Sequence, residues 1–450
     1  MALASSNPNN KVVVGYYPSW KSAALAAFDY TQVTHMQHAF AILQKDGSIS
    51  FDGDWFMDRI TKAAQAKGTK VTISVGGWTG SFAFSPVVAS KDLRTKFIDN
   101  VVNFLDLHFL DGVDLDWEYP GRLGDNCNKF DKVNDAPNFL LLLKELRAAL
   151  DKKFGTDADK RKIITLAIRV QPFDGPDGPI KDVRAYAEQV DFASIMAFDI
   201  GGGWSKTTAP LAPFRYERGK GDAYSVVQAV NDWLKAGWPA SKLVLGVPFY
   251  GRSVTTTVDM SKDLANQYAN KTMDVPHGDG EDAPWDDVCA GTGAVLSGVW
   301  SWKNMRSQGP LSGPTTAGAE WVRSVDPITK TPWLFNSRTN TYISYDDPDS
   351  LANKVSYADK MGLRGMMTWE LHGDNNELLP VLNKIRSSTS TGPENGIDHG
   401  HYDDGSSDGG SGHGGNGGNE SGNSAASAAA SGALHASLGL GVAAALFNMY

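Results

Sequence analysis

Eight short runs rich in β-branched and aromatic residues, separated by helical stretches, constrain the fold of this chain most strongly. They span residues 12–17, 35–42, 70–75, 112–117, 163–170, 192–198, 243–248 and 365–369. Strands that alternate with helices are typical of an α/β fold with a parallel sheet. Eight such units predict a (β/α)8 TIM barrel. One intervening helix is expected to begin at Asp92 as N-cap and to pack an apolar stripe on the barrel, formed by Leu93, Phe97, Val101 and Leu105.

The alternation stops between the seventh and eighth strands. Residues 255–333 are rich in Trp, Gly and Asp, and they predict a small α+β insertion. The catalytic barrel is therefore expected over residues 12–254 and 334–386. Because the insertion follows the carboxyl end of a strand, we expect it to border the mouth of the barrel, where active sites of this fold lie.

Two further segments follow the barrel. Residues 387–432 consist largely of Gly, Ser, Asn, Asp and His, a composition that cannot bury a core and predicts a flexible stalk. Residues 433–450 form an apolar tail behind the small residues at 421–425, which is the layout of a GPI-attachment signal. The tail is shorter than a comfortable transmembrane helix, so any membrane association is expected through such an anchor.

The beginning of the chain gives a different indication, because residues 1–11 show neither a cationic segment nor an apolar run. A GPI signal serves only a protein that enters the secretory route. We therefore expect an extracellular or cell-surface protein whose leader is missing from the sequence given. An intracellular protein is the alternative.

Composition excludes several classes of function. The chain has 42 basic and 51 acidic residues, a net charge of −9, and therefore no basic surface for nucleic acid. Its two cysteines, Cys127 and Cys289, lie outside any zinc-binding pattern, and no nucleotide or phosphate motif is present. We expect a monomer without metal or cofactor. Spacing does not decide between a Cys127–Cys289 disulfide and two separate thiols.

The candidate catalytic residues are the acids within residues 111–120, whose sequence is DGVDLDWEYP. Side chains alternate along a strand, so Asp114, Asp116 and Glu118 share one face and would line the barrel interior. Asp111 is out of phase and is interpreted as structural. Burial and mutual repulsion raise the pKa values of such carboxyl groups, as a general acid at neutral pH requires. The alternatives are an acidic strand end paired with a basic loop, or an Mg²⁺ site.

This pattern, D-G-x-D-x-D-W-E, resembles the catalytic signature of glycoside hydrolase family 18, the chitinases. Further segments resemble family motifs in family order, namely residues 15–20, 74–78, 248–252, 344–348 and 365–370. The resemblance covers about residues 12–386. It implies hydrolysis with retention and without an enzyme nucleophile, a recognised exception to two-carboxylate glycoside hydrolysis.

The resemblance also implies roles for individual residues. Glu118 would protonate the glycosidic oxygen, the acetamide of the substrate would attack to form an oxazolinium ion, and Asp116 would accept the acetamide N–H. Asp114 would share a proton with Asp116. Trp369 would form an apolar floor under the sugar, and Trp20 and Trp78 would stack on sugar rings. The rest of the substrate-binding pocket would be lined by Met196, Phe198, Asp199, Tyr250, Arg252 and Tyr119. Phe198 departs from the family, which has Tyr there.

The expected partner is chitin or chitooligosaccharides, cleaved at β-1,4 bonds between N-acetylglucosamine units. An endo-β-N-acetylglucosaminidase acting on N-glycans is one alternative, and a chitin-binding lectin without catalysis is another. The insertion favours a long polymer because it would deepen the groove. The presence of Glu118 argues against the lectin, since such lectins usually lack this residue.

Overall fold

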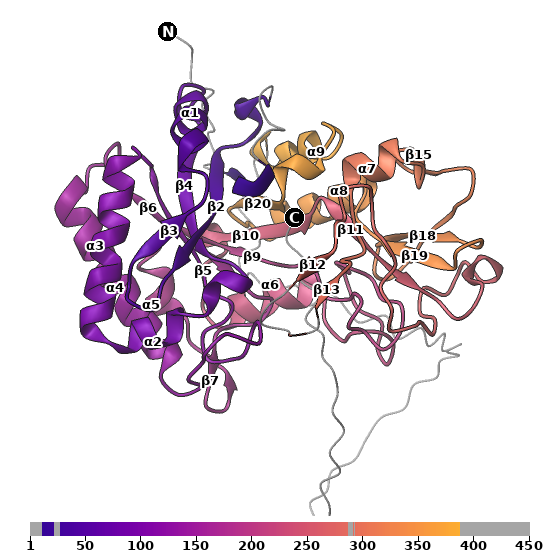
Figure 1. The fold of residues 1–450 in the computed structure, drawn as a ribbon, viewed down its shortest axis with the longest axis horizontal. Helices are drawn as coiled ribbons and strands as arrows, with labels where there is room; N and C mark the ends of the chain where they lie inside the picture. Colours follow the sequence, from indigo (N-terminus) through magenta and orange to yellow (C-terminus); the bar gives the residue numbers. More distant parts are fainter. Residues whose placement is uncertain (1–10, 22–27, 287–290, 292, 388–450) are drawn as a thin grey trace, which may run out of the picture. The chain divides into compact units, whose positions relative to one another are not determined.

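The computed structural model describes residues 11–21, 28–286, 291 and 293–387, and its centre is a closed barrel of parallel strands (Figure 1). The pairing of β1 with β2 closes the ring. In order around the ring the strands are β1 (Val12–Pro18), β2 (His35–Leu43), β4 (Lys70–Gly76), β5 (Gly112–Asp116), β6 (Ile163–Ile168), β9 (Phe192–Ile195), β10 (Leu243–Pro248) and β20 (Gly365–Trp369). The predicted (β/α)8 barrel is confirmed, and each strand begins within one residue of its predicted start.

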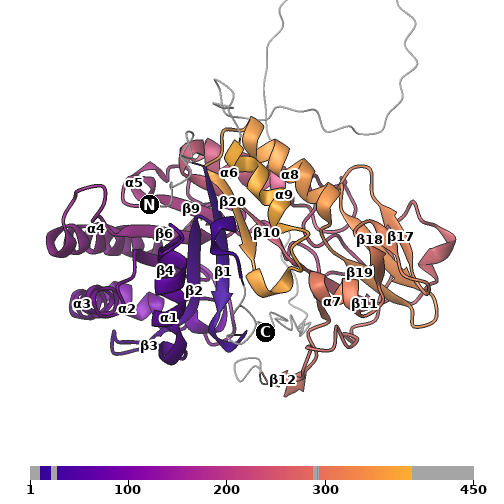
Figure 2. The same ribbon diagram turned by 90° about the horizontal axis from the view of Figure 1, so that it is seen from above.

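Strand alternation divides the apolar residues into two clusters. In β1, Val12, Val14 and Tyr16 belong to a cluster inside the barrel, whereas Val13 and Tyr17 belong to the larger core between strands and helices. The described helices beside the barrel are α1 (Asp54–Gln65), α2 (Phe84–Ala89), α3 (Lys91–Leu107), α4 (Asp135–Phe154), α5 (Arg184–Ala187), α6 (Val226–Lys235), α8 (Pro348–Lys360) and α9 (Leu379–Asn383). Helices α3 and α4 lie side by side outside the strands (Figure 2).

The start of α3 differs from the prediction. Its N-cap is Ser90, whose hydroxyl accepts the Leu93 N–H, and Asp92 lies in the first helical turn. The prediction of Asp92 as N-cap is therefore wrong; an acidic residue in the first turn still favours the helix, because it faces the positive end of the helix dipole. The predicted stripe is largely buried, through Phe97, Val101 and Leu105.

Between β10 and β20 the chain forms an antiparallel sheet, called the insert sheet below. Its strands in spatial order are β14 (Val299–Ser301), β11 (Tyr250–Thr255), β19 (Thr341–Ser344), β18 (Pro332–Asn336) and β17 (Val322–Val325). The insert sheet begins at Tyr250 and ends at Ser344, so it extends beyond both boundaries expected for the insertion, residues 255 and 333. Phe249 alone separates β10 from β11, so no turn residue marks the start, and the β18–β19 hairpin extends the sheet to Ser344.

Smaller elements complete the described chain. The helix α7 (Trp302–Ser307) follows β14, and its Trp302 indole donates hydrogen bonds to Asn375 (2.9 Å) and Glu377 (3.0 Å) near the end of the barrel. The short strands are β3 (Ile49–Phe51), which extends β2, and the hairpin pairs β7 (Asp174–Gly175) with β8 (Gly178–Pro179), β12 (Trp285–Asp286) with β13 (Ala294–Val295), and β15 (Leu311–Gly313) with β16 (Thr316–Ala317).

Several expectations fall partly or wholly on residues that the structure does not describe. Cys127 is disulfide-bonded, and the other cysteine of the chain, Cys289, lies outside the described residues. The expected stalk from residue 388 onward and the apolar tail at 433–450 also lie outside them. Among the residues that are described, no helix is long and apolar enough to cross a membrane.

The motif at residues 344–348 builds the start of α8. Asp347 caps the helix because its carboxylate accepts the Asp349 and Ser350 N–H groups, and its own N–H donates to the Ser350 hydroxyl. Asp346 forms an ion pair of 2.5 Å with Lys354, and both side chains are at most 1% exposed. Burial raises the pKa of Asp346, and the Lys354 ammonium opposes that rise.

Removal of Lys354 should therefore destabilise the barrel. Lys354→Met leaves the Asp346 carboxyl buried without its cation, which should lower the free energy of unfolding by about 3 kcal/mol. Lys360→Met, at the exposed last turn of the same helix, should change it by less than about 0.5 kcal/mol. Urea denaturation of both variants checks this, and equal stability would show that the pair contributes nothing.

Candidate active site

The acids of residues 114–118 lie at the carboxyl end of β5, inside the barrel. Asp114, Asp116 and Glu118 are 0%, 3% and 5% exposed. The intervening Leu115 and Trp117 belong to the outer core between strands and helices. Strand alternation thus places three carboxyl groups, called the acid row below, in the barrel interior.

Asp114 is the most strongly hydrogen-bonded member of the acid row. Its Oδ2 accepts bonds from the Tyr16 hydroxyl (2.9 Å) and the Ser74 hydroxyl (2.7 Å), and its Oδ1 accepts one from Thr165 (2.6 Å). Burial raises the pKa of Asp114, and these three hydroxyl groups oppose the rise. The adjacent strands β4 and β6, together with β1 across the barrel, therefore hold this carboxyl in one orientation.

Asp116 has fewer partners. Its Oδ1 is buried and accepts no hydrogen bond from the described part of the chain. Burial, followed by the charges of Glu118 and Asp114, raises its pKa well above the ordinary value. A buried acceptor without a donor is costly, because nearly all such groups in proteins are hydrogen-bonded. Asp116 thus has a buried oxygen that no donor of the described residues occupies.

Glu118 follows the strand, and its backbone is held on both sides. Its N–H donates to the Ser81 hydroxyl (2.9 Å), and its carbonyl accepts from the Asn128 amide (2.9 Å). The close approach of β4 to β5 requires a glycine at Gly76, where an added Cβ would lie 2.1 Å from the Asp116 carbonyl oxygen. The backbone therefore fixes the direction of the Glu118 side chain.

The environment of Glu118 favours its protonated form. Burial is the largest cause that raises its pKa, a hydrogen bond with Tyr119 opposes the rise, and the negative charges of Asp199 and Asp125 add to it. Together they raise the pKa of Glu118 to about 7. A carboxyl group with this pKa can donate a proton near neutral pH and then take one back.

An aromatic group lies beside the acid row. The Trp369 ring stacks on Phe40, with centroids 5.6 Å apart and planes at 11°, and lies 5.4 Å from Tyr16. Trp20, in the turn after β1, lies 6.5 Å from Trp369 and is 40% exposed. These rings provide flat apolar faces of the kind on which sugar rings pack.

An ion pair between Arg252 and Asp199 also belongs to the site. Arg252, on β11, contacts both Asp199 carboxylate oxygens at 2.5 and 3.1 Å, and the Tyr250 hydroxyl donates to Asp199 at 2.6 Å. Asp199 follows β9 and adopts φ +52°. The first strand of the insert sheet is thereby joined to the loop after a barrel strand.

Phe198 and Met196 belong to the apolar cluster inside the barrel, together with Trp369. The Phe198 ring meets Tyr250 edge to face, with centroids 6.4 Å apart. Phe198 therefore occupies the interior position expected for it and brings no hydroxyl group there.

The two other aromatic residues expected at the site lie near Glu118. Trp78 is only 8% exposed and meets Tyr119 edge to face at 6.4 Å, so most of its surface is covered by protein. The Arg169 guanidinium lies over the Tyr119 ring at 5.8 Å. Tyr119 is thus held between an indole and a cation.

Sequence reasoning missed the side chains that orient the acid row, namely Tyr16, Ser74, Thr165, Ser81 and Asn128. Tyr16 and Thr165 had a signal, since interior positions alternate along β1 and β6. Ser81 and Asn128 are in connecting segments, where no periodicity points to a partner.

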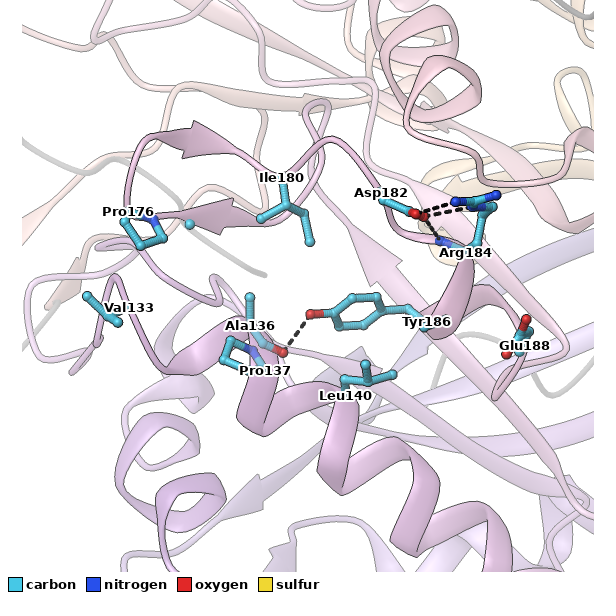
Figure 3. Close-up of a pocket in the computed structure, with 12 residues that line it drawn as sticks. Val133, Ala136, Pro137, Leu140, Pro176, Ile180, Asp182, Arg184, Tyr186 and Glu188 are labelled. Atoms are coloured by element: carbon cyan, nitrogen blue, oxygen red, sulfur yellow. Dashed lines mark hydrogen bonds and ion pairs between the residues drawn. The ribbon is translucent and has the colours of Figure 1, made fainter.

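A separate pocket of about 630 Å³ lies among α4, the β7–β8 hairpin and α5 (Figure 3). Its lining includes Pro137, Ile180 and Tyr186, whose hydroxyl donates to the Ala136 carbonyl at 2.7 Å. No member of the acid row lines it. The described residues also contain no group of three or more His, Cys, Asp or Glu side chains arranged to hold a metal ion.

Comparison with known proteins identifies the family of this chain. A family model described as glycosyl hydrolases family 18 matches residues 12–374. A chitinase-like effector of Moniliophthora roreri is 34% identical, over 84% of this chain and 94% of that protein. Chitinase A1 of Niallia circulans is 30% identical, over 84% of this chain and 58% of that protein. The crystal structure of a Rhizomucor miehei chitinase is 33% identical, with a TM-score of 0.75, over 84% of this chain and 100% of that one. The chain belongs to glycosyl hydrolase family 18.

Proposed function

We propose that this protein is a chitinase that hydrolyses β-1,4 bonds between N-acetylglucosamine units with retention, using the acetamide of the substrate as nucleophile. The acid row carries the proposal, because it combines a carboxyl group of pKa about 7 with a buried carboxyl oxygen to which no described residue donates. The chitinases of Niallia circulans and Rhizomucor miehei support the substrate class.

The first step breaks the glycosidic bond. Glu118 donates its proton to the glycosidic oxygen, which leaves with the bonding electrons as the hydroxyl of the departing sugar. The acetamide oxygen attacks the anomeric carbon from the opposite face and closes an oxazolinium ring. Asp116 accepts the acetamide N–H through Oδ1, and its negative charge stabilises the positive charge that develops on the ring.

The second step reverses these roles. Glu118, now ionised, takes a proton from water, and the water oxygen attacks the anomeric carbon while the ring opens to restore the acetamide. Two displacements at one carbon retain its configuration. Asp114 stays bonded to three hydroxyl groups and, by holding a proton near Asp116, moderates the repulsion between them.

The surrounding residues would orient the sugar. Trp369 forms the floor under the reacting unit, and Trp20 extends the aromatic surface. Tyr250 and Arg252 hold Asp199, which borders the same site. Because Phe198 contributes no hydroxyl group, the acetamide depends mainly on Asp116 for its hydrogen bond.

A second candidate function is oligosaccharide binding without hydrolysis, favoured by similarity to a protein named a chitinase-like effector. The two functions need the same cleft but differ in the need for a proton donor. An intact Glu118 with a raised pKa favours hydrolysis.

The Glu118→Gln variant tests the proposed catalysis. The amide cannot donate a proton as an acid, so kcat on tetra-N-acetylchitotetraose should fall by at least about 100-fold, while calorimetry should still detect binding. Glu188→Gln, an exposed exchange of the same kind after α5, should leave kcat unchanged.

Turnover near the wild-type rate in Glu118→Gln would refute the role of Glu118. A wild-type protein that binds the tetrasaccharide but releases no product would establish the binding function instead. Cellotetraose, which lacks acetamide groups, should not be cleaved.

The configuration of the first product tests the nucleophile. Double displacement through the acetamide should release the β-anomer, which early ¹H NMR spectra distinguish before mutarotation mixes the two forms. Initial release of the α-anomer would exclude this route, because the α-anomer forms when water attacks the β-linked carbon directly and inverts it.

A further inference from the structure

A series of alternating charges connects the turn after β1 with the end of β20 and with the insert, the segment 250–344 that contains the insert sheet. Lys21 Nζ lies 3.5 Å from Glu370 Oε1 and 3.6 Å from Glu281 Oε2. The other carboxylate oxygen of Glu281 lies 3.0 Å from Lys303 Nζ on α7. One ammonium group is thus shared by carboxylates from two parts of the fold.

Each partner of Lys21 is itself held in place. Glu370 follows Trp369 directly, and its Oε2 accepts the His372 N–H at 2.6 Å and contacts His372 Nδ1 at 2.9 Å. The side chains of Glu370 and Lys21 are 7% and 15% exposed. This pair is therefore less screened by solvent than an ordinary surface ion pair.

Lys21 follows Trp20 in a three-residue 3₁₀ turn, Ser19–Lys21, in which no residue is buried. Such a turn has no core of its own to fix the indole. Trp20 contacts Trp369 and Phe40 at centroid distances of 6.5 and 6.4 Å, and the ion pairs of the adjacent lysine provide a second attachment.

The position of Lys21 should let it affect oligosaccharide binding without affecting proton donation by the acid row. Lys21 contacts neither the acid row nor Asp199 through any ion pair or hydrogen bond found in the described chain, so its loss should not change proton donation. The Trp20 ring is connected to the acid row through Trp369: it contacts Trp369, which contacts Tyr16, whose hydroxyl donates to Asp114. Only an oligosaccharide long enough to pass Trp369 would reach that ring.

Building on the proposed function, we infer that Lys21 is a positioning residue that holds Trp20 between the barrel and the insert, and that it determines affinity for long N-acetylglucosamine oligomers. Glu281 is its partner in this role, because Glu281 supplies the attachment to the insert. Short oligomers that remain at the cleavage point do not depend on the pair.

The test measures dissociation constants by calorimetry in the Glu118→Gln background, where hydrolysis does not interfere. Adding Lys21→Met should weaken binding of hexa-N-acetylchitohexaose about five-fold and leave that of tri-N-acetylchitotriose within about two-fold. Lys21→Arg should restore affinity for the hexamer. Lys262→Met is the matched control, since this lysine is 77% exposed and pairs with Asp259.

Glu281→Gln should reproduce the effect, and the double variant should lose little more than either single one, because both changes remove the same interaction. Equal weakening for both oligomers, or additive losses in the double variant, would overturn the inference. If neither oligomer binds the Glu118→Gln protein at all, the proposed function fails, and this inference fails with it.

Discussion

Removal of three carboxyl groups from water is the interaction on which the rest of the site depends. Burial is the largest cause of the raised pKa values of Asp114, Asp116 and Glu118. Ionising all three in the barrel would be prohibitive, so all three pKa values are raised, and hydroxyl donors oppose the rise only at Asp114. The same feature that makes the row costly for folding suits Glu118 to the proposed role of proton donor.

A further acid at the site, Asp199, is held in a different way. Asp199 lies beside the row, but it is held by the Arg252 guanidinium and the Tyr250 hydroxyl, both from β11. The Asp199 carboxylate adds negative charge near Glu118 and contributes to its raised pKa. Because Arg252 and Tyr250 hold that carboxylate, β11 helps to position a charge that acts on Glu118.

The barrel and the face of the acid row could be predicted from sequence, because both depend on patterns that repeat over a few residues. Alternation along β5 gave the face of the acid row, and eight strand-like runs gave the barrel. The boundary of the insert sheet could not be predicted, because β10 passes into β11 with no turn residue to mark the change. The N-cap of α3 was misplaced because Ser90 and Asp92 are both good capping residues two positions apart.

Long-range contacts were beyond sequence reasoning for a different reason. The hydrogen bond between Tyr16 and Asp114 joins residues 98 positions apart, and its existence depends on the shear of the closed barrel. The bridge from Lys21 to Glu281 depends on how the insert returns to the turn after β1. Neither leaves a local pattern in a single sequence.

The pH dependence of kcat/KM on an N-acetylglucosamine oligomer tests the central claim most directly. In the proposed mechanism Glu118 must be protonated to start the reaction. Burial is the largest cause that raises its pKa to about 7, so activity should fall as pH rises through about 7. The fall should be weaker for an aryl glycoside whose leaving group needs no proton. Activity that stays constant to about pH 9, or that is already lost near pH 5, where an ordinary exposed glutamate is ionised, would contradict the account.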